Sequence, residues 1–362
     1  MRRQSMITPE ISFILCCSRT NLNYKAISAL KNILVKELNW EQIITLSKQH
    51  RVASLIYQNI LKIDFLKQII PDGAFEDFRR YYYTTLHDNI SRWEELSSIL
   101  DNFRQHSIEA IPLKGIILAD ILYHNPGLRP IYADIDILIK ENDIGKASEI
   151  LKSLNYSMSM PKAGIYNILF SSGNRHIELH WNFIVSWLTK IKTNELWQRS
   201  TTGLINGKEI RLLSNEDLFW PLLVQIRYEL LYSSLFRICD LNELISQKAD
   251  ELDWGYIFKT AQRYHLVNCL CLSLTLCQKL LSTPIPNNIL KKLRKAGVKK
   301  TILSNLSRQR LAYLIIEGTT HKKAELWNQL LKFLMTDSIT DTIKILKHKL
   351  TYPQKIKPLQ NL

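Results

Sequence analysis

The apolar residues of the first hundred positions recur at helical spacing. Asn39-Trp40-Glu41-Gln42 has the composition of a helix start. Apolar residues then follow at i, i+3 and i+4 over 52–63 and over the long stretch 75–106. The aromatic stripe of that long stretch is typical of core packing. We therefore predict that residues 8–106 are helical throughout.

Short apolar or alternating runs replace the helical pattern after Ser107, and turn residues separate them. The helical pattern returns at Ser214-x-x-Asp217, which resembles a capping box, and continues to Lys349 with a break at Pro284 and Pro286. Strands are predicted at 108–113, 131–139, 156–160, 165–170 and 176–181, helices at 116–123 and 144–154, and a hairpin around Asn206-Gly207 over 201–213.

This order of elements predicts an α+β protein with three parts. A helical segment, 1–106, precedes a mixed α/β core, 107–213, and a helical, basic segment follows at 214–362. A small sheet held against helices is a common setting for a ligand cleft. We therefore expect the functional residues in the middle part.

Composition fits a globular protein and adds a charge bias. Of the 362 residues, 46% are hydrophobic and 22% charged, and the net charge is +15. From Lys291 onward there are 16 Lys and Arg against 4 Asp and Glu. Such a basic end can attract nucleic acid, anionic lipid or a polyphosphate, or it can be a solvated helical surface.

The cysteines and the apolar runs indicate the compartment. None of the six cysteines forms a CxxC pair, which favours buried free thiols over a structural zinc site. The apolar run 11–17 is too short for a signal peptide, and the run 266–276 is too short to span a bilayer. We therefore expect a cytoplasmic protein without stable membrane insertion.

Two aspartates interrupt the otherwise apolar run 131–139. In a strand, Asp134 and Asp136 project from the same face, roughly 7 Å apart along the backbone. Ile135 and Ile137 then point into a core. Adjacent carboxylates repel each other and are costly to bury, and a divalent cation at the strand end makes the arrangement favourable.

A later strand offers a third carboxylate. In the run 176–181, alternation places His176, Glu178 and His180 on one face. Three carboxylates from two neighbouring strands can hold two Mg²⁺ ions about 3.5–4 Å apart. Such a site binds a nucleoside triphosphate and lowers the pKa of an attacking hydroxyl.

Several short motifs resemble a known family. These are Leu113-Lys114-Gly115, residues 123–126, Arg129-Pro130 and the strand 134–139. Together they are similar to the uncharacterised bacterial nucleotidyltransferase family of the DNA polymerase β-like superfamily. Glu178-Leu179-His180-Trp181 is similar to the later acidic-Leu-His-Trp segment of that family. The resemblance implies a small mixed-sheet polymerase β-like nucleotidyltransferase core flanked by helices.

The resemblance also implies roles for residues. Asp134 and Asp136 would bind the Mg²⁺ that carries the triphosphate, and Glu178 would help to bind the catalytic metal and to activate the acceptor. Gly115 would form the turn beside the phosphates, and Lys114 and Arg129 would contact the triphosphate. Asp240 matches an acidic position to which no role can be assigned.

The motifs depart from the wider superfamily in two ways. Lys114-Gly115-Ile116 lacks the usual serine contact to phosphate, and Glu178 stands where many relatives carry Asp. The longer side chain could displace a metal by about 1 Å, which costs of order 10²-fold in rate where geometry is critical. A catalytically degraded enzyme is therefore an alternative.

Each candidate also has a structural interpretation. The aspartate pair could accept hydrogen bonds from backbone amides, and His180 could be a satisfied structural histidine. Glu178 could pair with Arg175 or Lys162, Lys114 could be solvated, and Arg129 could bridge to Asp134. The chain contains no legible Ser-His-Asp or Cys-His arrangement, no Walker loop and no G-x-G-x-x-G motif.

The combined pattern predicts a Mg²⁺-dependent nucleotidyltransferase. It would move a nucleoside monophosphate from a nucleoside triphosphate to an acceptor hydroxyl or phosphate and release pyrophosphate. The acceptor could be a small molecule, a peptide or protein, or an RNA. One alternative is a module that has lost catalysis and binds nucleotide or nucleic acid or serves as a biosynthetic accessory protein. Another is transfer of the γ-phosphate or of pyrophosphate.

Overall fold

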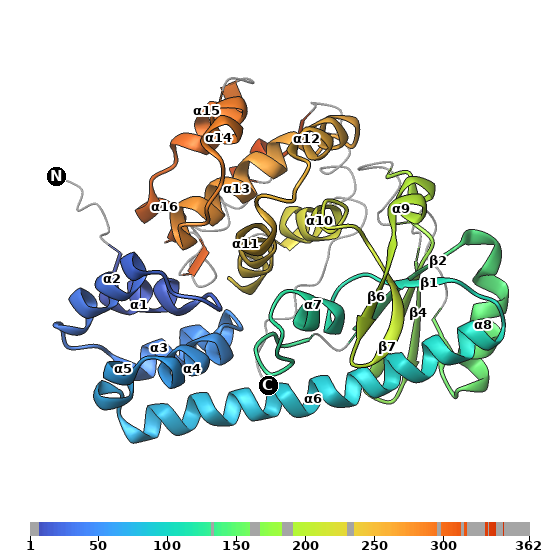
Figure 1. Cartoon of the computed structure of the whole chain (residues 1–362), viewed down its shortest axis with the longest axis horizontal. Helices are drawn as coiled ribbons and strands as arrows, with labels where there is room; N and C mark the ends of the chain where they lie inside the picture. Colours follow the sequence, from blue (N-terminus) through green and yellow to red (C-terminus); the bar gives the residue numbers. More distant parts are fainter. Residues whose placement is uncertain are drawn as a thin grey trace.

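A computed structural model gives the fold (Figure 1). It describes residues 7–131, 134–159, 167–182, 191–229, 235–294, 298–312, 315–316, 330–331, 333–337 and 343.

Helices fill the N-terminal part, as predicted for residues 8–106. Three of them begin where a side-chain oxygen accepts a hydrogen bond from the first turn, at Thr8, Asn23 and Asn39. The last helix, α6, runs for 34 residues beneath both the other N-terminal helices and the sheet (Figure 1). The helices are α1 (Pro9–Cys17), α2 (Tyr24–Leu34), α3 (Trp40–Gln49), α4 (Ala53–Lys62), α5 (Asp64–Ile69) and α6 (Asp72–Gln105).

A five-stranded mixed sheet forms the middle of the chain, which confirms the predicted α+β class. Its order is β1-β2-β5-β4-β3, with β2 and β5 parallel and the other pairs antiparallel. The strands are β1 (Ala110–Pro112), β2 (Asp134–Ile139), β3 (Ser157–Met158), β4 (Asn167–Ser172) and β5 (Arg175–His180).

Two of these strands differ from the predicted limits. The strand predicted at 108–113 is shorter, and β1 ends at Pro112, which is tolerated because β1 lies at the sheet edge. The predicted strand 131–139 is described from Asp134 onward, since residues 132–133 lie outside the described residues. Residues 160–166, between β3 and β4, are also outside them.

The two faces of the sheet have different neighbours. Ile135, Ile137 and Leu179 are buried in a core with residues of α6 and of α8 (Ile144–Ser153). Leu138 lies on the opposite face, with Asp136, and packs in the larger core that the N- and C-terminal helices share. The alternation predicted from the sequence is therefore confirmed in β2.

A separate two-stranded hairpin follows the five-stranded sheet, as predicted around Asn206-Gly207. Both turn residues have positive φ, 47° and 77°, as a two-residue type I′ turn requires. The 3-10 helix η1 (Glu141–Asp143) and the helix α7 (Ile116–Ile121) complete the middle part together with α9 (Thr193–Arg199), β6 (Thr201–Ile205) and β7 (Lys208–Leu212).

The C-terminal part is helical where it is described. The backbone N–H of Asp217 donates to Ser214 Oγ at 3.2 Å, as the capping pattern predicted. Pro284 and Pro286 lie between α13 and α14, at the predicted break, whereas most residues beyond 316 and the Pro353 tail lie outside the described residues. The helices are α10 (Phe219–Glu229), α11 (Phe236–Lys248), α12 (Trp254–Arg263), α13 (Val267–Leu281), α14 (Asn287–Arg294), α15 (Val298–Asn305) and α16 (Arg308–Ala312).

All six cysteines are buried free thiols, as the sequence predicted. Among the helices that the structure describes, none has the length and apolar character needed to cross a bilayer.

Candidate functional site

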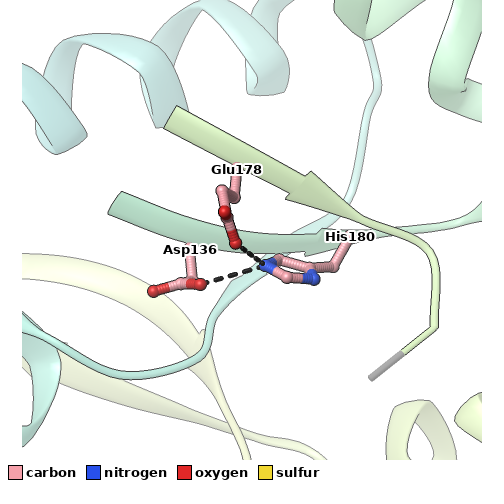
Figure 2. A group of neighbouring side chains, drawn as sticks. All are labelled: Asp136, Glu178 and His180. Carbon is pink, nitrogen blue, oxygen red and sulfur yellow. Dashed lines mark hydrogen bonds and ion pairs between the residues drawn. The ribbon is translucent and has the colours of Figure 1, made fainter. Parts of the chain in front are cut away.

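The carboxylate-bearing face of the sheet brings together residues of β2 and β5. The parallel register pairs Asp136 with Glu178 and Asp134 with His176. Figure 2 shows that Asp136 and Glu178 point toward the imidazole of His180. The predicted meeting of carboxylates from two neighbouring strands is therefore confirmed for Asp136 and Glu178.

Asp136 is the buried centre of the group, with 3% of its surface exposed. Its Oδ1 atom lies 3.0 Å from Lys114 Nζ and 3.0 Å from His180 Nε2. Burial alone would raise the pKa of Asp136, but the charge of Lys114 and the hydrogen bond from His180 outweigh it and lower the pKa to about 2. Asp136 is therefore an anion at neutral pH.

His180 bridges two carboxylates. Its Nε2 atom lies 3.0 Å from Asp136 Oδ1 and 3.2 Å from Glu178 Oε2. Burial alone would lower the pKa of His180, but the hydrogen bonds to Asp136 and Glu178 raise it to about 9. The imidazole is therefore protonated at neutral pH. The sequence favoured a structural histidine here, although alternation already placed His180 on the face of Glu178.

Asp134 lies on the same face, one step nearer the start of β2. Burial and the charge of Asp136 raise its pKa, while Lys114 acts in the opposite direction. The sequence offered Arg175 or Lys162 as a partner for Glu178. The ion pair that the structure describes is with His180. Lys162 lies outside the described residues.

The turn after β1 places Lys114 beside Asp136. The N–H of Leu113 donates to the backbone oxygen of Asp136 at 3.0 Å, so that the turn lies along β2. Gly115 then adopts φ +67°, in the left-handed region that favours glycine. Burial alone would lower the pKa of Lys114, but the charges of Asp136 and Asp134 raise it. Lys114 is therefore a partner of the carboxylates, not the solvated residue of the structural interpretation.

Arg129 is buried away from solvent, with 4% of its surface exposed. Its guanidinium binds Asp240 through two hydrogen bonds, of 2.8 and 2.7 Å, and Nη1 donates to the carbonyl of Gly115 at 3.1 Å. The sequence offered Asp134 as a structural partner of Arg129, whereas the ion pair of Arg129 is with Asp240. Asp240 thus has a contact that no local pattern indicated, because it lies 111 residues away in the chain.

The donor set fits a divalent cation. One donor atom each from Asp136, Glu178 and His180 lies within 4.8 Å of the others, and Asp134 is outside this group of the described residues. Carboxylate oxygens are the usual ligands of Mg²⁺ and Mn²⁺, and a neutral imidazole adds a ligand that suits transition metals. The buried anion Asp136 is the kind of group that is stable only when paired or bound to a metal.

Comparison with known proteins gives a family match and similarities to solved structures. A family model described as "Uncharacterised nucleotidyltransferase" matches residues 36–282, which is more than half of the chain. No curated protein matches. The solution structure of the antibiotic-resistance factor ANT(2'')-Ia is similar over 48% of this chain and 95% of its own, with 12% identity and a TM-score of 0.35. A crystal structure of an antigenic nucleotidyltransferase-like protein from Paracoccidioides brasiliensis is similar over 54% of this chain and 94% of its own, with 19% identity and a TM-score of 0.30.

Proposed function

The chain belongs to the uncharacterised nucleotidyltransferase family, and on that premise we propose that it moves a nucleoside monophosphate from a nucleoside triphosphate to an acceptor hydroxyl or phosphate. The observation that carries the proposal is the parallel register of Asp136 with Glu178, which brings two carboxylates and His180 within 4.8 Å. The acceptor is a small molecule, a peptide or protein, or an RNA.

The carboxylates are the proposed ligands. Asp134, Asp136 and Glu178 would hold Mg²⁺, with two ions when the triphosphate is present. Bound Mg²⁺ neutralises the triphosphate and lowers the pKa of the attacking hydroxyl. Asp136 is suited to this role because its pKa, lowered to about 2, keeps it anionic at neutral pH.

The chain's other residues orient the reactants. Lys114 carries its positive charge to the same face and would contact the phosphates, and Gly115, at φ +67°, would form the turn beside them. The acceptor oxygen forms a bond to the α-phosphorus while the bond to the bridging oxygen breaks and pyrophosphate leaves. Glu178 would help to activate the acceptor and take up its proton.

One observation favours a second candidate, a nucleotide-binding module without transfer. Asp136 Oδ1 already contacts two cationic groups, Lys114 and His180. These groups neutralise much of the negative charge of the carboxylates, which a metal ion would otherwise neutralise. The missing phosphate-turn serine points in the same direction. In this case the site would bind a triphosphate and release no pyrophosphate.

The test combines binding and turnover. Purified protein is titrated with ATP, GTP, CTP and UTP with and without Mg²⁺, and pyrophosphate release is followed in the presence of candidate acceptors. Asp136→Asn should abolish metal-dependent triphosphate binding. Glu109→Gln is the matched control, because Glu109 is an exposed carboxylate one residue before β1 that pairs with Lys140 and Arg211.

The outcomes separate the candidates. Absence of metal-dependent binding, or an Asp136→Asn protein that binds like Glu109→Gln, would refute the proposal. Binding without pyrophosphate release with every acceptor favours the module. Label from α-labelled ATP on the acceptor supports nucleotidyl transfer, whereas label from γ-labelled ATP alone indicates transfer of the γ-phosphate.

A further inference from the structure

A buried ion pair connects the C-terminal helices to the turn beside the carboxylates. Asp240, in α11, is fully buried and accepts hydrogen bonds from three donors. Two come from Arg129, at 2.8 and 2.7 Å, and the third comes from the hydroxyl of Tyr123 at 2.8 Å. The bidentate pairing fixes the plane of the guanidinium.

Another nitrogen of the same guanidinium reaches the turn. Nη1 of Arg129 donates to the carbonyl oxygen of Gly115 at 3.1 Å. That carbonyl already accepts a hydrogen bond from the N–H of Ala119 at 3.3 Å. The contact is therefore not required to satisfy this acceptor, and it joins Arg129 to the turn.

The Lys114–Gly115 turn brings the amine of Lys114 to Asp136. Lys114 directly precedes Gly115, and its Nζ lies 3.0 Å from Asp136 Oδ1. Arg129 is also held through its backbone, since Asn89 of α6 donates to its carbonyl oxygen at 2.8 Å. A continuous series of contacts therefore runs from Asp240 through Arg129 and Gly115 to the carboxylate face of the sheet.

We propose that Asp240 and Arg129 are positioning residues, through which α11 holds the Lys114–Gly115 turn so that the Lys114 amine stays against Asp136. The inference rests on the proposed function for what Lys114 does there. It gives a role to Asp240, and it assigns Arg129 to the turn instead of to the triphosphate. Holding the Lys114 amine in place matters because errors of about 1 Å in such groups reduce rates strongly.

The test removes the link without leaving a buried charge. In the triple variant Tyr123→Phe/Arg129→Met/Asp240→Leu, every polar group of the link is replaced by an apolar one of similar size, which buried ion pairs often tolerate. Tyr123→Phe alone is the matched control, because it removes a hydrogen bond to Asp240 and leaves the Arg129–Gly115 contact. The rate at which a small amine-reactive reagent acylates Lys114 is measured by mass spectrometry. The acylation rate of Lys67, an exposed lysine in α5, is the internal reference.

In the folded triple variant, Lys114 acylation should rise by roughly fivefold or more relative to Lys67, because the turn opens locally. Affinity for ATP with Mn²⁺ should fall in the same variant, whereas Tyr123→Phe should match the wild type in both measurements. A folded triple variant with wild-type Lys114 protection would overturn the proposal, since the pair would then serve stability alone.

A second variant keeps the test decisive if the triple variant does not fold. Arg129→Lys retains a charge for Asp240 but has no planar second nitrogen to reach Gly115. It should also expose Lys114, and unchanged protection in this variant would overturn the proposal. Acylation is measured without nucleotide, so its result stands even if the wild type does not bind ATP, an outcome that would refute only the proposed function.

Discussion

At the scale of single residues, the site is a compact charge cluster. Asp134, Asp136 and Glu178 supply negative charge, and Lys114 and protonated His180 supply positive charge. A buried carboxylate is tolerated at Asp136 because both cations contact one of its oxygens. The same cations oppose the entry of a metal, so the protonation of His180 should control how the site binds one.

The pKa shifts predict how stability depends on pH. The pKa of His180 is raised from 6.5 to about 9, so its stabilising contact is complete below pH 6.5 and is lost as the pH rises through 9. The pKa of Asp136 is lowered from 3.8 to about 2, so its contribution is present above pH 3.8 and is lost as the pH falls through 2. His180→Asn should therefore lower the free energy of unfolding by on the order of 2–3 kcal/mol near pH 6, and by much less near pH 10.

Urea denaturation of the wild type and of His180→Asn at the two pH values measures this difference. His176→Asn, four residues earlier in β5, is the control for replacing a histidine of this strand. An equal effect of His180→Asn at both pH values would contradict the prediction.

Metal binding should release a proton from His180. The imidazole is protonated at neutral pH, and its Nε2 could join the carboxylates as a ligand only after that proton is lost. Titration calorimetry with Mn²⁺ near pH 7.5, in buffers of different ionisation enthalpy, should give about one proton released by the wild type and close to none by His180→Asn. Equal proton release by both proteins would mean that His180 keeps its proton when the metal binds.

At the scale of elements, the sequence predicted strand faces better than long-range partners. Period-two alternation correctly placed Asp136 and Glu178 on one face and Ile137 in the core, because each strand carries that information locally. The pairing of Arg129 with Asp240 joins a loop to a helix 111 residues away, and nothing in either segment identifies the other. The contacts of His180 with Asp136 and Glu178 were not predicted, because the pattern of one strand does not identify a partner on another.

Two glycines offer a matched test of the turn that aligns β5 with β4. Gly173, in the β4–β5 turn, has φ +60°, whereas Gly145 lies in α8, and no atom lies within 4 Å of a Cβ built on either residue. Gly173→Ala should therefore destabilise the protein by about 1 kcal/mol, because alanine is strained at positive φ. Gly145→Ala should stabilise it by roughly 0.5–1 kcal/mol through helix propensity. Chemical denaturation measures both, and effects of the same sign would contradict the backbone argument.

At the scale of the whole molecule, α6 is one of the elements that contribute to both cores, as β2 and α7 also do. Phe78 belongs to the larger core of N- and C-terminal helices, whereas Leu96 and Phe103 belong to the core beneath the sheet. One continuous helix therefore joins the two cores. We therefore expect the two cores to unfold together.

Interrupting α6 between the cores should separate them. Asp88 is exposed near the middle of α6, and proline there removes a helical hydrogen bond at a cost of about 3 kcal/mol. Calorimetry of Asp88→Pro should show two thermal transitions where the wild type shows one, and Asp88→Ala is the control that keeps the helix. A single, merely lowered transition in Asp88→Pro would show that contacts other than α6 couple the cores.

The parallel pairing of β2 with β5 also has a consequence for folding kinetics. Asp136 and His180 are 44 residues apart, so a large loop must close before they meet. Bringing the carboxylates together adds repulsion at that late step, when nearby helices and the β4–β5 hairpin can already have formed. Folding of β2 onto β5 is therefore expected to be the slow event, and divalent cations present during refolding should accelerate it.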